Sequence, residues 1–142
     1  MAHFGERSEG NLENVDNALV EVCRFVIQKF DFTVLCGWRG EAEQNRAYPK
    51  YTKVKFPNSK HNIMPSMAVD LIPYDAKYGT IVSWTSYEEM AMLAGHMLMA
   101  AFALSVELRW GHDWNRNGIL WDERGKLVDR PHFELVTKGI VT

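Results

Sequence analysis

Apolar residues recur at steps of three or four between residues 11 and 30, and polar residues occupy most positions between them. This spacing places apolar side chains on one face of an α-helix, which then packs against a core. The apolar positions are Leu12, Val15, Leu19, Val22 and Val26. We therefore predict a first main helix over about residues 11–30.

A second apolar segment covers residues 90–104 and predicts the other main helix, buried in the core. Ser86 precedes this segment, and Glu89 follows Ser86 at the spacing of a capping box, in which the two residues satisfy free backbone N–H groups at a helix start. The sequence also predicts a short helix over residues 41–47.

Short segments rich in β-branched and aromatic residues predict strands. We expect them at residues 32–35, 67–72, 81–84, 106–110 and 132–136. Pro73 is expected to end the second strand, and residues 49–59 are expected to form a polar loop. The order of these elements predicts an α+β domain in which a small, mainly antiparallel sheet packs against two main helices.

Composition narrows the class of protein. The chain has 142 residues, of which 46% are hydrophobic and 24% charged, which fits one globular domain with one core. The net charge of -2 gives no basic excess for a nucleic-acid partner. Cys23 and Cys36 are too few for a disulfide framework, and their apolar neighbours predict buried free thiols. Without a signal-peptide pattern or a membrane-spanning apolar run, we expect a cytosolic protein with no stable membrane association.

Three residues form a candidate metal site: His61, Asp70 and His132. Zinc binds imidazole and carboxylate groups well, and a catalytic zinc site keeps one position for water, whose pKa the metal lowers. Asp129 lies three residues before His132 and is a candidate general base. On spacing alone, a His and an Asp nine residues apart are more often unrelated, and His132 is as well explained as a core histidine.

The residues around these candidates resemble the VanY and VanX group of zinc peptidases. The matching motifs are Ser59-x-His61, Ser66-x-Ala68-x-Asp70 and Asp129-x-x-His132-x-Glu134. The group comprises D,D-carboxypeptidases, D,D-dipeptidases and phage L-alanyl-D-glutamate endopeptidases. Its usual first motif is Ser-x-His-x-x-Gly-x-Ala-x-Asp. This chain has two extra residues between His61 and Asp70, and Ser66 stands in place of Gly, which implies a slightly longer loop.

Further matches in the expected order make the chain similar to short phage endolysins of this group, among them Gly37-x-Arg39 followed by Gln44. The resemblance implies a fold like that of Hedgehog and D-Ala-D-Ala peptidases. It places Arg39 over the active site, where a guanidinium fork suits an oxyanion or a substrate carboxylate, although a surface arginine is the commoner case. Glu134 shares a strand face with His132 and is expected to support that ligand, and Ser59 is expected to orient the site.

The resemblance also implies a function. We expect a zinc hydrolase that cleaves the L-Ala–D-Glu bond of peptidoglycan stem peptides and acts as a phage endolysin. We expect one catalytic domain over residues 1–142 without a separate wall-binding domain, a monomer, and retention in the host cytoplasm until a holin opens the way to the cell wall. The alternatives are a D,D-carboxypeptidase or dipeptidase of the same group, and a wall-binding module that has lost catalysis.

The segment from Asp113 to Arg124 resembles an EF-hand calcium loop in its alternating oxygen ligands and its turn glycine. The candidate calcium ligands are Asp113, Asn115, Asn117, Ile119, Asp122 and Glu123. The twelfth position holds Arg124 where an EF-hand has Glu, so this is not a standard EF-hand, and a polar turn is the plainer alternative. We expect calcium to order this loop and thereby complete the catalytic site.

Four lysines gather near the polar loop: Lys50, Lys53, Lys55 and Lys60. Contact with an anionic cell wall and a simply solvated loop explain them equally well.

Overall fold

The structure is a computed structural model and describes residues 2–123 and 126–136. The helices and strands follow in the order α1 (Glu6–Leu12), α2 (Asn17–Ile27), β1 (Phe32–Cys36), α3 (Glu41–Ala47), β2 (Ala68–Asp75), β3 (Thr80–Ile81), α4 (Tyr87–Ala103), β4 (Leu108–Trp110) and β5 (His132–Leu135). Short 3₁₀ helices at Lys60–Asn62 and Trp121–Glu123 lie in the connections. The short helix predicted at residues 41–47 is confirmed.

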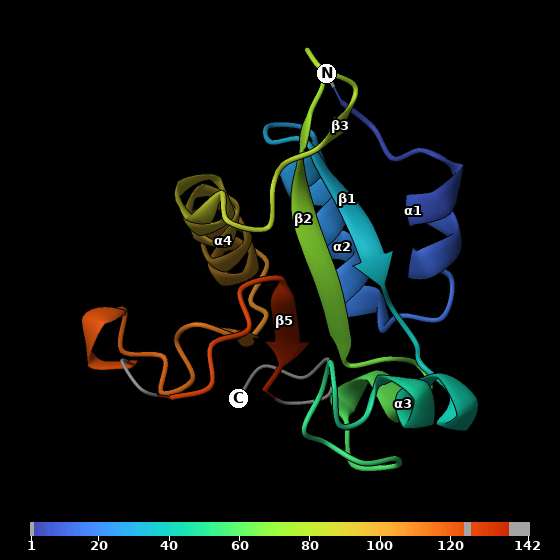
Figure 1. Cartoon of the computed structure of the whole chain (residues 1–142). Helices are drawn as coiled ribbons and strands as arrows, with labels where there is room; N and C mark the ends of the chain where they lie inside the picture. Colours follow the sequence, from blue (N-terminus) through green and yellow to red (C-terminus); the bar gives the residue numbers. More distant parts are fainter. Residues whose placement is uncertain (1, 124–125, 137–142) are drawn as a thin grey trace.

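The strands form one antiparallel sheet in the order β1-β2-β5-β4, and β3 pairs with the far end of β2. The α+β prediction is therefore confirmed. Figure 1 shows α2 behind β1 and β2, and α3 at the lower end of these strands. The pairing register places Asp70 of β2 opposite both Cys36 of β1 and His132 of β5. Residues from three distant parts of the chain thus meet at one end of the sheet, where β1 ends and β5 begins.

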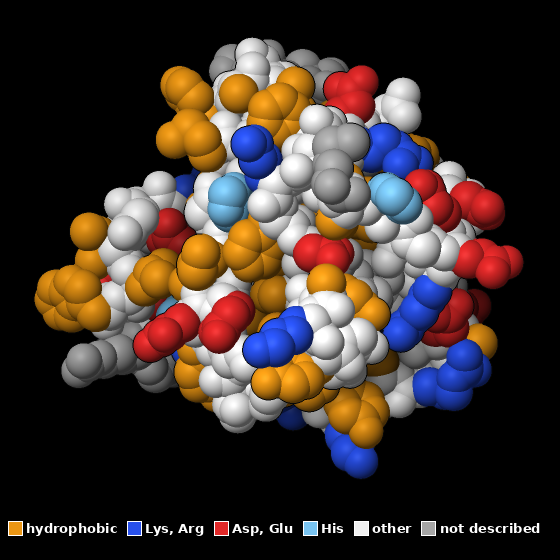
Figure 2. All heavy atoms as spheres, turned by 90° about the horizontal axis from the view of Figure 1, so that it is seen from above, with side chains coloured by type: hydrophobic (Ala, Val, Ile, Leu, Met, Phe, Trp, Pro, Cys, Tyr) orange, Lys and Arg blue, Asp and Glu red, His pale blue; other side chains and the backbone are white. Residues whose placement is uncertain are grey.

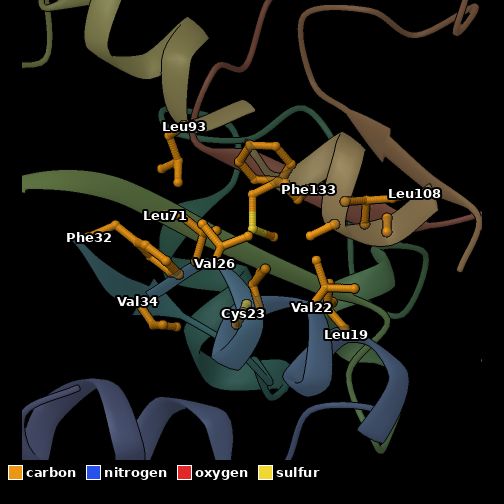
Figure 3. Packing of buried hydrophobic residues seen from close by; sticks show 14 of the residues in the cluster. Leu19, Val22, Cys23, Val26, Phe32, Val34, Leu71, Leu93, Leu108 and Phe133 are labelled. Atoms are coloured by element: carbon orange, nitrogen blue, oxygen red, sulfur yellow. The ribbon is translucent and has the colours of Figure 1, made fainter. Parts of the chain in front are cut away.

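The core lies between the sheet and the helices α2 and α4 (Figure 3). Its fully buried members include Leu19 and Val22 of α2, Leu71 of β2, Leu93 of α4 and Phe133 of β5. Burying a side chain of this size contributes about 1.5–3 kcal/mol. Because successive strand residues point to opposite faces, the strands that bury Leu71 and Phe133 in the core direct the neighbouring residues to the other face.

The single helix predicted over residues 11–30 is wrong, because the chain breaks between α1 and α2. Val15 forms an isolated bridge with Ser66, and the backbone N–H of Asp16 donates to the Ser66 carbonyl at 2.9 Å. The Asp16 side chain then caps α2 by accepting from the N–H of Ala18 at 3.0 Å. The apolar period continues across the break, so it could not reveal a segment that pairs with a distant part of the chain.

The prediction that Pro73 ends its strand is also wrong, since β2 continues to Asp75. Pro73 lies opposite Phe32, and the bond between the strands here runs from the N–H of Tyr74 to the carbonyl of Asp31 at 3.0 Å. The missing N–H of Pro73 therefore removes no hydrogen bond between β1 and β2. The strand predicted at residues 81–84 is shorter than expected and comprises Thr80–Ile81.

Helix α4 departs from its prediction in two ways. Ser86 occupies the N-cap position, but its side chain makes no capping hydrogen bond, so the expected capping box with Glu89 is wrong. The helix is also not buried on all sides, because Met92, Met99 and Phe102 are 58%, 67% and 80% exposed. Among the described helices, none combines the length and apolar character needed to cross a membrane.

Candidate metal centre

The fold brings both candidate histidines to Asp70, which belongs to two groups whose possible ligand atoms lie within 4.8 Å of one another: Cys36, His61 and Asp70 form one, and Asp70, Asp129 and His132 form the other. The Nε2 atom of His61 and the Nδ1 atom of His132 each lie 3.3 Å from the same oxygen, Oδ1 of Asp70. The centroids of the two imidazole rings are 5.2 Å apart. Both histidines are buried. His61 comes from the 3₁₀ helix before β2, Asp70 from β2 and His132 from β5, so the sheet register sets their spacing.

The second nitrogen of each imidazole has a partner outside this cluster. His61 donates from Nδ1 to the Gly37 carbonyl at 2.7 Å, and His132 donates from Nε2 to Oε1 of Glu134 at 2.8 Å. These bonds leave a lone pair on each nitrogen that faces Asp70. Histidines that ligate metals are oriented in this way, by a carbonyl or carboxylate on the far side of the ring. Two neutral imidazoles and one carboxylate fit a divalent metal ion.

The electrostatics of the cluster agree with such a role. Burial alone would lower the pKa of His61 and of His132, but the Asp70 carboxylate outweighs burial and raises these values to about 10 and about 9. Burial alone would raise the pKa of Asp70, yet the two imidazoles hold it well below its usual range. A pocket that attracts protons this strongly also attracts a cation, and a bound metal replaces the protons on its ligands.

Glu134 supports His132 and is itself held by cations. Its Oε2 atom accepts a hydrogen bond from Nη2 of Arg109 at 2.9 Å and lies 3.0 Å from Nζ of Lys60. Burial would raise the pKa of Glu134, but its hydrogen bonds, that from His132 foremost, lower this value to about 2. The carboxylate therefore remains an acceptor for the imidazole.

Ser59 acts on the backbone of the site. Its hydroxyl accepts from the N–H of His61 at 3.2 Å, and its own N–H donates to Oδ1 of Asn62 at 3.1 Å. This reciprocal pair caps the 3₁₀ helix that carries His61. Ser59 thus orients the ligand through the chain direction and has no direct contact with the imidazole.

Asp129 offers a carboxylate oxygen within 4.8 Å of the ligand atoms of Asp70 and His132. The N–H of Asp129 donates to the Gly111 carbonyl at 2.7 Å, and the N–H of His132 donates to the Asp129 carbonyl at 3.1 Å. A side chain at Gly111 would collide with that Asp129 carbonyl, so the close approach requires glycine. Asp129 is exposed at the surface of the site, and partial desolvation of its carboxyl group, followed by the nearby charge of Asp70, raises its pKa above the ordinary value.

Arg39 lies beside Asp70, with Nη2 of the arginine 3.5 Å from Oδ2 of the carboxylate. Its Nη1 atom donates to Oε1 of Gln44 at 3.0 Å. Its backbone N–H donates to the carbonyl of His61 at 2.8 Å. The guanidinium is partly exposed and is therefore open to a substrate group that approaches the cluster.

Cys36 is a site residue that the sequence did not reveal. Its sulfur lies 3.8 Å from Nδ1 of His61 and 3.7 Å from Nη2 of Arg39. The prediction of a buried thiol is confirmed for Cys23 and wrong for Cys36, which is only half-buried. Strand alternation would place Cys36 on the core face with Val34, but a register shift between these two residues turns it toward Asp70.

The candidate calcium loop contains buried carboxylates. Asp113 is 6% exposed and Glu123 is 1% exposed. Among the described residues, the buried side-chain oxygens without a hydrogen-bond partner include Oδ1 of Asp113, Oδ1 of Asp122, and both Oε1 and Oε2 of Glu123. Oε2 of Glu123 lies 3.7 Å from Nζ of Lys126. Each such oxygen suits an oxygen-binding cation, but Asp113, Asp122 and Glu123 are not among the described groups of three whose ligand atoms lie within 4.8 Å of one another.

The remaining candidates in this loop are engaged in turns. Asn115 accepts from the N–H of Asn117 at 3.2 Å, and Asn117 accepts from the N–H of Ile119 at 2.8 Å. Asn117 also donates to Oδ2 of Asp122 at 2.7 Å. The loop thus brings Asn117 and Asp122 into contact and uses Asn115 in a polar turn. Arg124, at the twelfth position, lies outside the described residues.

Comparison with known proteins gives consistent results. Residues 1–136 match the sequence model of the family described as phage L-alanyl-D-glutamate peptidase. The L-alanyl-D-glutamate peptidase of Escherichia phage T5 is 31% identical over 137 residues, which cover 94% of this chain and 97% of that protein. The crystal structure of the L-Ala D-Glu endopeptidase ChiX of Serratia marcescens matches with a TM-score of 0.70 and 28% identity, over 93% of this chain and 88% of ChiX.

Proposed function

The chain belongs to the phage L-alanyl-D-glutamate peptidase family, and from this we infer that it hydrolyses the bond between L-alanine and D-glutamate in peptidoglycan stem peptides. It is a peptidoglycan peptidase and acts as a phage endolysin in lysis of the bacterial host. The names of both relatives specify cleavage between L-alanine and D-glutamate. Each match covers most of this chain and most of the relative.

We assign the catalytic metal as zinc, held by His61, Asp70 and His132. The observation that carries this assignment is that both imidazoles face one Asp70 oxygen at 3.3 Å while their other nitrogens are bonded elsewhere. Two nitrogens and one carboxylate oxygen are a common donor set of catalytic zinc sites. When bound, zinc supplies Lewis acidity that lowers the pKa of water and polarises a carbonyl group.

Protein groups around the ligands perform the remaining chemistry. Asp129 accepts a proton from the attacking water and returns it to the leaving amine of D-glutamate, a role that its raised pKa favours. Arg39 lies beside the cluster with a partly exposed guanidinium and stabilises the negative charge that develops on the carbonyl oxygen. Glu134 and Ser59 hold the ligands, one through the ring of His132 and the other through the backbone of His61.

Mass spectrometry of digested wall tests this function. Purified peptidoglycan is incubated with zinc-loaded protein, and the fragments are identified. New N-terminal D-glutamate is the expected product. Loss of terminal D-alanine instead would identify a D,D-carboxypeptidase or dipeptidase. Binding to the wall without any new product would identify a wall-binding module. Metal analysis of the purified protein gives the identity and amount of the bound ion.

We also propose that the loop from Asp113 to Glu123 binds calcium. Asp113, Asp122 and Glu123 each have a buried side-chain oxygen without a hydrogen-bond partner, and this supports the assignment because such an oxygen is costly to bury. The loop precedes Asp129 and His132 in the chain. Calcium bound here would order the connection that positions the general base and one zinc ligand.

Membership of a phage peptidase family supports a route of action as well. The protein accumulates in the host cytoplasm and reaches the wall after a holin permeabilises the membrane. A monomer suffices for the proposed chemistry, because every assigned group comes from one chain.

A further inference from the structure

Positive charge is concentrated in one segment of the chain. Residues 44–69 contain Arg46 and four lysines but no Asp or Glu, in a protein whose net charge is -2. This segment follows the start of α3 and ends in β2, so it includes His61. In Figure 1 it lies at the lower end of the molecule, beside α3. We call residues 46–55 of this segment the basic loop.

The cations of the basic loop are exposed and free of acidic partners. Arg46, Lys50, Lys53 and Lys55 are all exposed, and within residues 2–123 and 126–136 no carboxylate lies within ion-pair distance of them. Lys60 differs, because its ammonium group is paired with Glu134 at 3.0 Å. The basic loop therefore presents four positive charges that are available to a ligand.

Tyrosine rings hold two of these lysines. The ammonium of Lys50 lies 5.1 Å from the ring centroid of Tyr51, and that of Lys55 lies 5.3 Å from the ring centroid of Tyr48. Contacts of this kind attract a cation by about 0.5–1 kcal/mol at exposed sites. Tyr51 is itself 76% exposed. The two charges thus have preferred positions on the surface.

A buried glutamine fixes the basic loop beside the catalytic cluster. Gln44 is completely buried, and its Nε2 atom donates to the carbonyl of Val54 at 2.6 Å. Its Oε1 atom accepts from Arg39 at 3.0 Å and from Asn62 at 3.2 Å. One side chain therefore joins the basic loop, the arginine beside Asp70 and the residue after His61. Gln44 and Arg39 thus form a chain of contacts from the Val54 carbonyl of the basic loop to the Asp70 carboxylate.

The opposite end of the molecule has a different charge pattern. Figure 2 views the molecule from that end, where Lys and Arg side chains lie among Asp and Glu side chains. Neighbouring charges of opposite sign offset one another at a distance, and physiological salt screens the remaining field beyond about 8 Å. A polyanion is therefore attracted to the end that carries the basic loop and the catalytic cluster.

We propose that the basic loop binds carboxylates of stem peptides that neighbour the peptide being cleaved. This inference rests on the proposed function, because peptidoglycan carries a carboxylate on each D-glutamate and repeats its stem peptides along every glycan strand. A single exposed ion pair contributes little, but several charges on one repeating polymer act together. The basic loop keeps the enzyme on the wall between cuts and presents the next stem to the metal site.

Sedimentation with purified peptidoglycan sacculi tests this inference. The triple variant Lys50→Glu, Lys53→Glu, Lys55→Glu reverses three charges of the basic loop. The matched control Arg7→Glu, Lys29→Glu, Lys77→Glu makes the same change in net charge at exposed positions outside the loop. We expect the loop variant to bind sacculi at least about tenfold more weakly than wild type, and the control to lose much less. Wild-type binding should also weaken between 0.1 M and 1 M salt.

The outcomes separate this inference from the proposed function. Binding is measured in the presence of a metal chelator, so that hydrolysis does not release the protein. If wild type produces N-terminal D-glutamate but both triple variants bind sacculi equally, the inference is wrong and the function stands. If no hydrolysis occurs yet only the loop variant loses binding, the proposed function is wrong, and of the inference only the binding of the basic loop to the wall remains. Circular dichroism and thermal unfolding establish that both variants fold.

A membrane is the other anionic surface that a lysis protein meets. Vesicles of phosphatidylglycerol and phosphatidylcholine form a second arm of the experiment. Loss of vesicle binding in the loop variant with unchanged binding to sacculi would assign the basic loop to the membrane and overturn the inference. Loss of binding to sacculi in the loop variant, with unchanged binding to vesicles, supports the inference.

Discussion

Arg39 and Gln44 are joined by one hydrogen bond of 3.0 Å, from Nη1 of the arginine to Oε1 of a glutamine that is completely buried. The Arg39 guanidinium, which lies beside Asp70, is thus held in place by a residue that is not one of the three candidate ligands. The same glutamine oxygen accepts from Asn62, the neighbour of His61. Gln44 is therefore a positioning residue, and its role is separable from metal binding.

Replacement of Gln44 by Ala is expected to lower kcat/KM about ten- to a hundredfold, because Arg39 loses its fixed orientation. The zinc content should stay near wild type, since none of the three ligands bonds to Gln44. Steady-state kinetics on a soluble stem peptide and metal analysis check this. Gln28→Ala, at an exposed position, is the control. Wild-type kinetics in a folded Gln44→Ala protein would contradict the positioning role.

Replacement of Asp129 by Asn is expected to lower kcat about 10²- to 10⁴-fold with the metal retained. A general base must be ionised, so the rate of the wild type should fall as the pH decreases through the pKa of Asp129, which lies above its ordinary value. In the Asp129→Asn variant this fall of the rate at low pH, the acidic limb of the pH–rate profile, should be absent. Asp31→Asn is the matched control, because burial raises the pKa of Asp31 as well but away from the site. An unchanged acidic limb in the Asp129 variant would exclude Asp129 as the base.

Calcium is expected to raise the Tm of the wild type, because an ion that binds only the folded state stabilises it by about 2.7 kcal/mol at a hundred times its Kd. Glu123→Gln removes a charge whose oxygens are buried without partners, and it should abolish the shift. Glu88→Gln, on α4, should retain the shift. Thermal unfolding and hydrolysis are measured at fixed zinc with and without a calcium-selective chelator. Equal Tm and equal rates in both conditions would eliminate the calcium site.

The two cysteines should differ in reactivity. Burial raises the pKa of the Cys23 thiol to about 12, so this side chain offers almost no thiolate at neutral pH. Cys36 is half-buried beside His61 and should react first with an alkylating reagent. Peptide mapping after partial alkylation identifies the modified residue, and activity should fall in step with modification of Cys36. A Cys36→Ser variant that is inactivated at the wild-type rate would contradict this assignment.

The raised pKa of Cys23 also predicts alkaline instability. In the unfolded chain the Cys23 thiol ionises above its ordinary pKa of 9.0, whereas burial in the folded protein keeps the thiol neutral up to a pKa of about 12. Ionisation therefore favours the unfolded state as the pH rises above about 9. Cys23→Ala should lose less stability than wild type between pH 8 and about 11. Denaturant unfolding at several pH values gives the free energy of unfolding of each protein. The same dependence on pH in wild type and Cys23→Ala would rule out a contribution from the Cys23 thiol.

Local patterns in the sequence were sufficient for much of the fold. The helix at residues 41–47 and the strands that carry Asp70 and His132 follow from periodicity and residue type, because burial of one face imposes both. The proximity of His61, Asp70 and His132 was expected from the surrounding motifs, and the register of β2 with β5 explains how it arises. No local rule could supply that register.

Three of the failures have a common cause in long-range pairing. The break before α2 exists because Val15 meets Ser66, and the continuation of β2 past Pro73 exists because the proline falls where β1 needs no donor. Cys36 escaped notice because a register shift reverses its face. In each case a distant partner overrides a local preference, and a single sequence does not name that partner.

The position of β5 has a consequence for synthesis of the enzyme. β5 lies between β2 and β4, and β4 pairs with the sheet only through β5. A nascent chain that has not yet emerged beyond β4 therefore lacks both His132 and the strand with which β4 pairs. Truncation before β5 would remove one candidate ligand and the pairing partner of β4 in a single step, so the candidate site and this edge of the sheet are completed together.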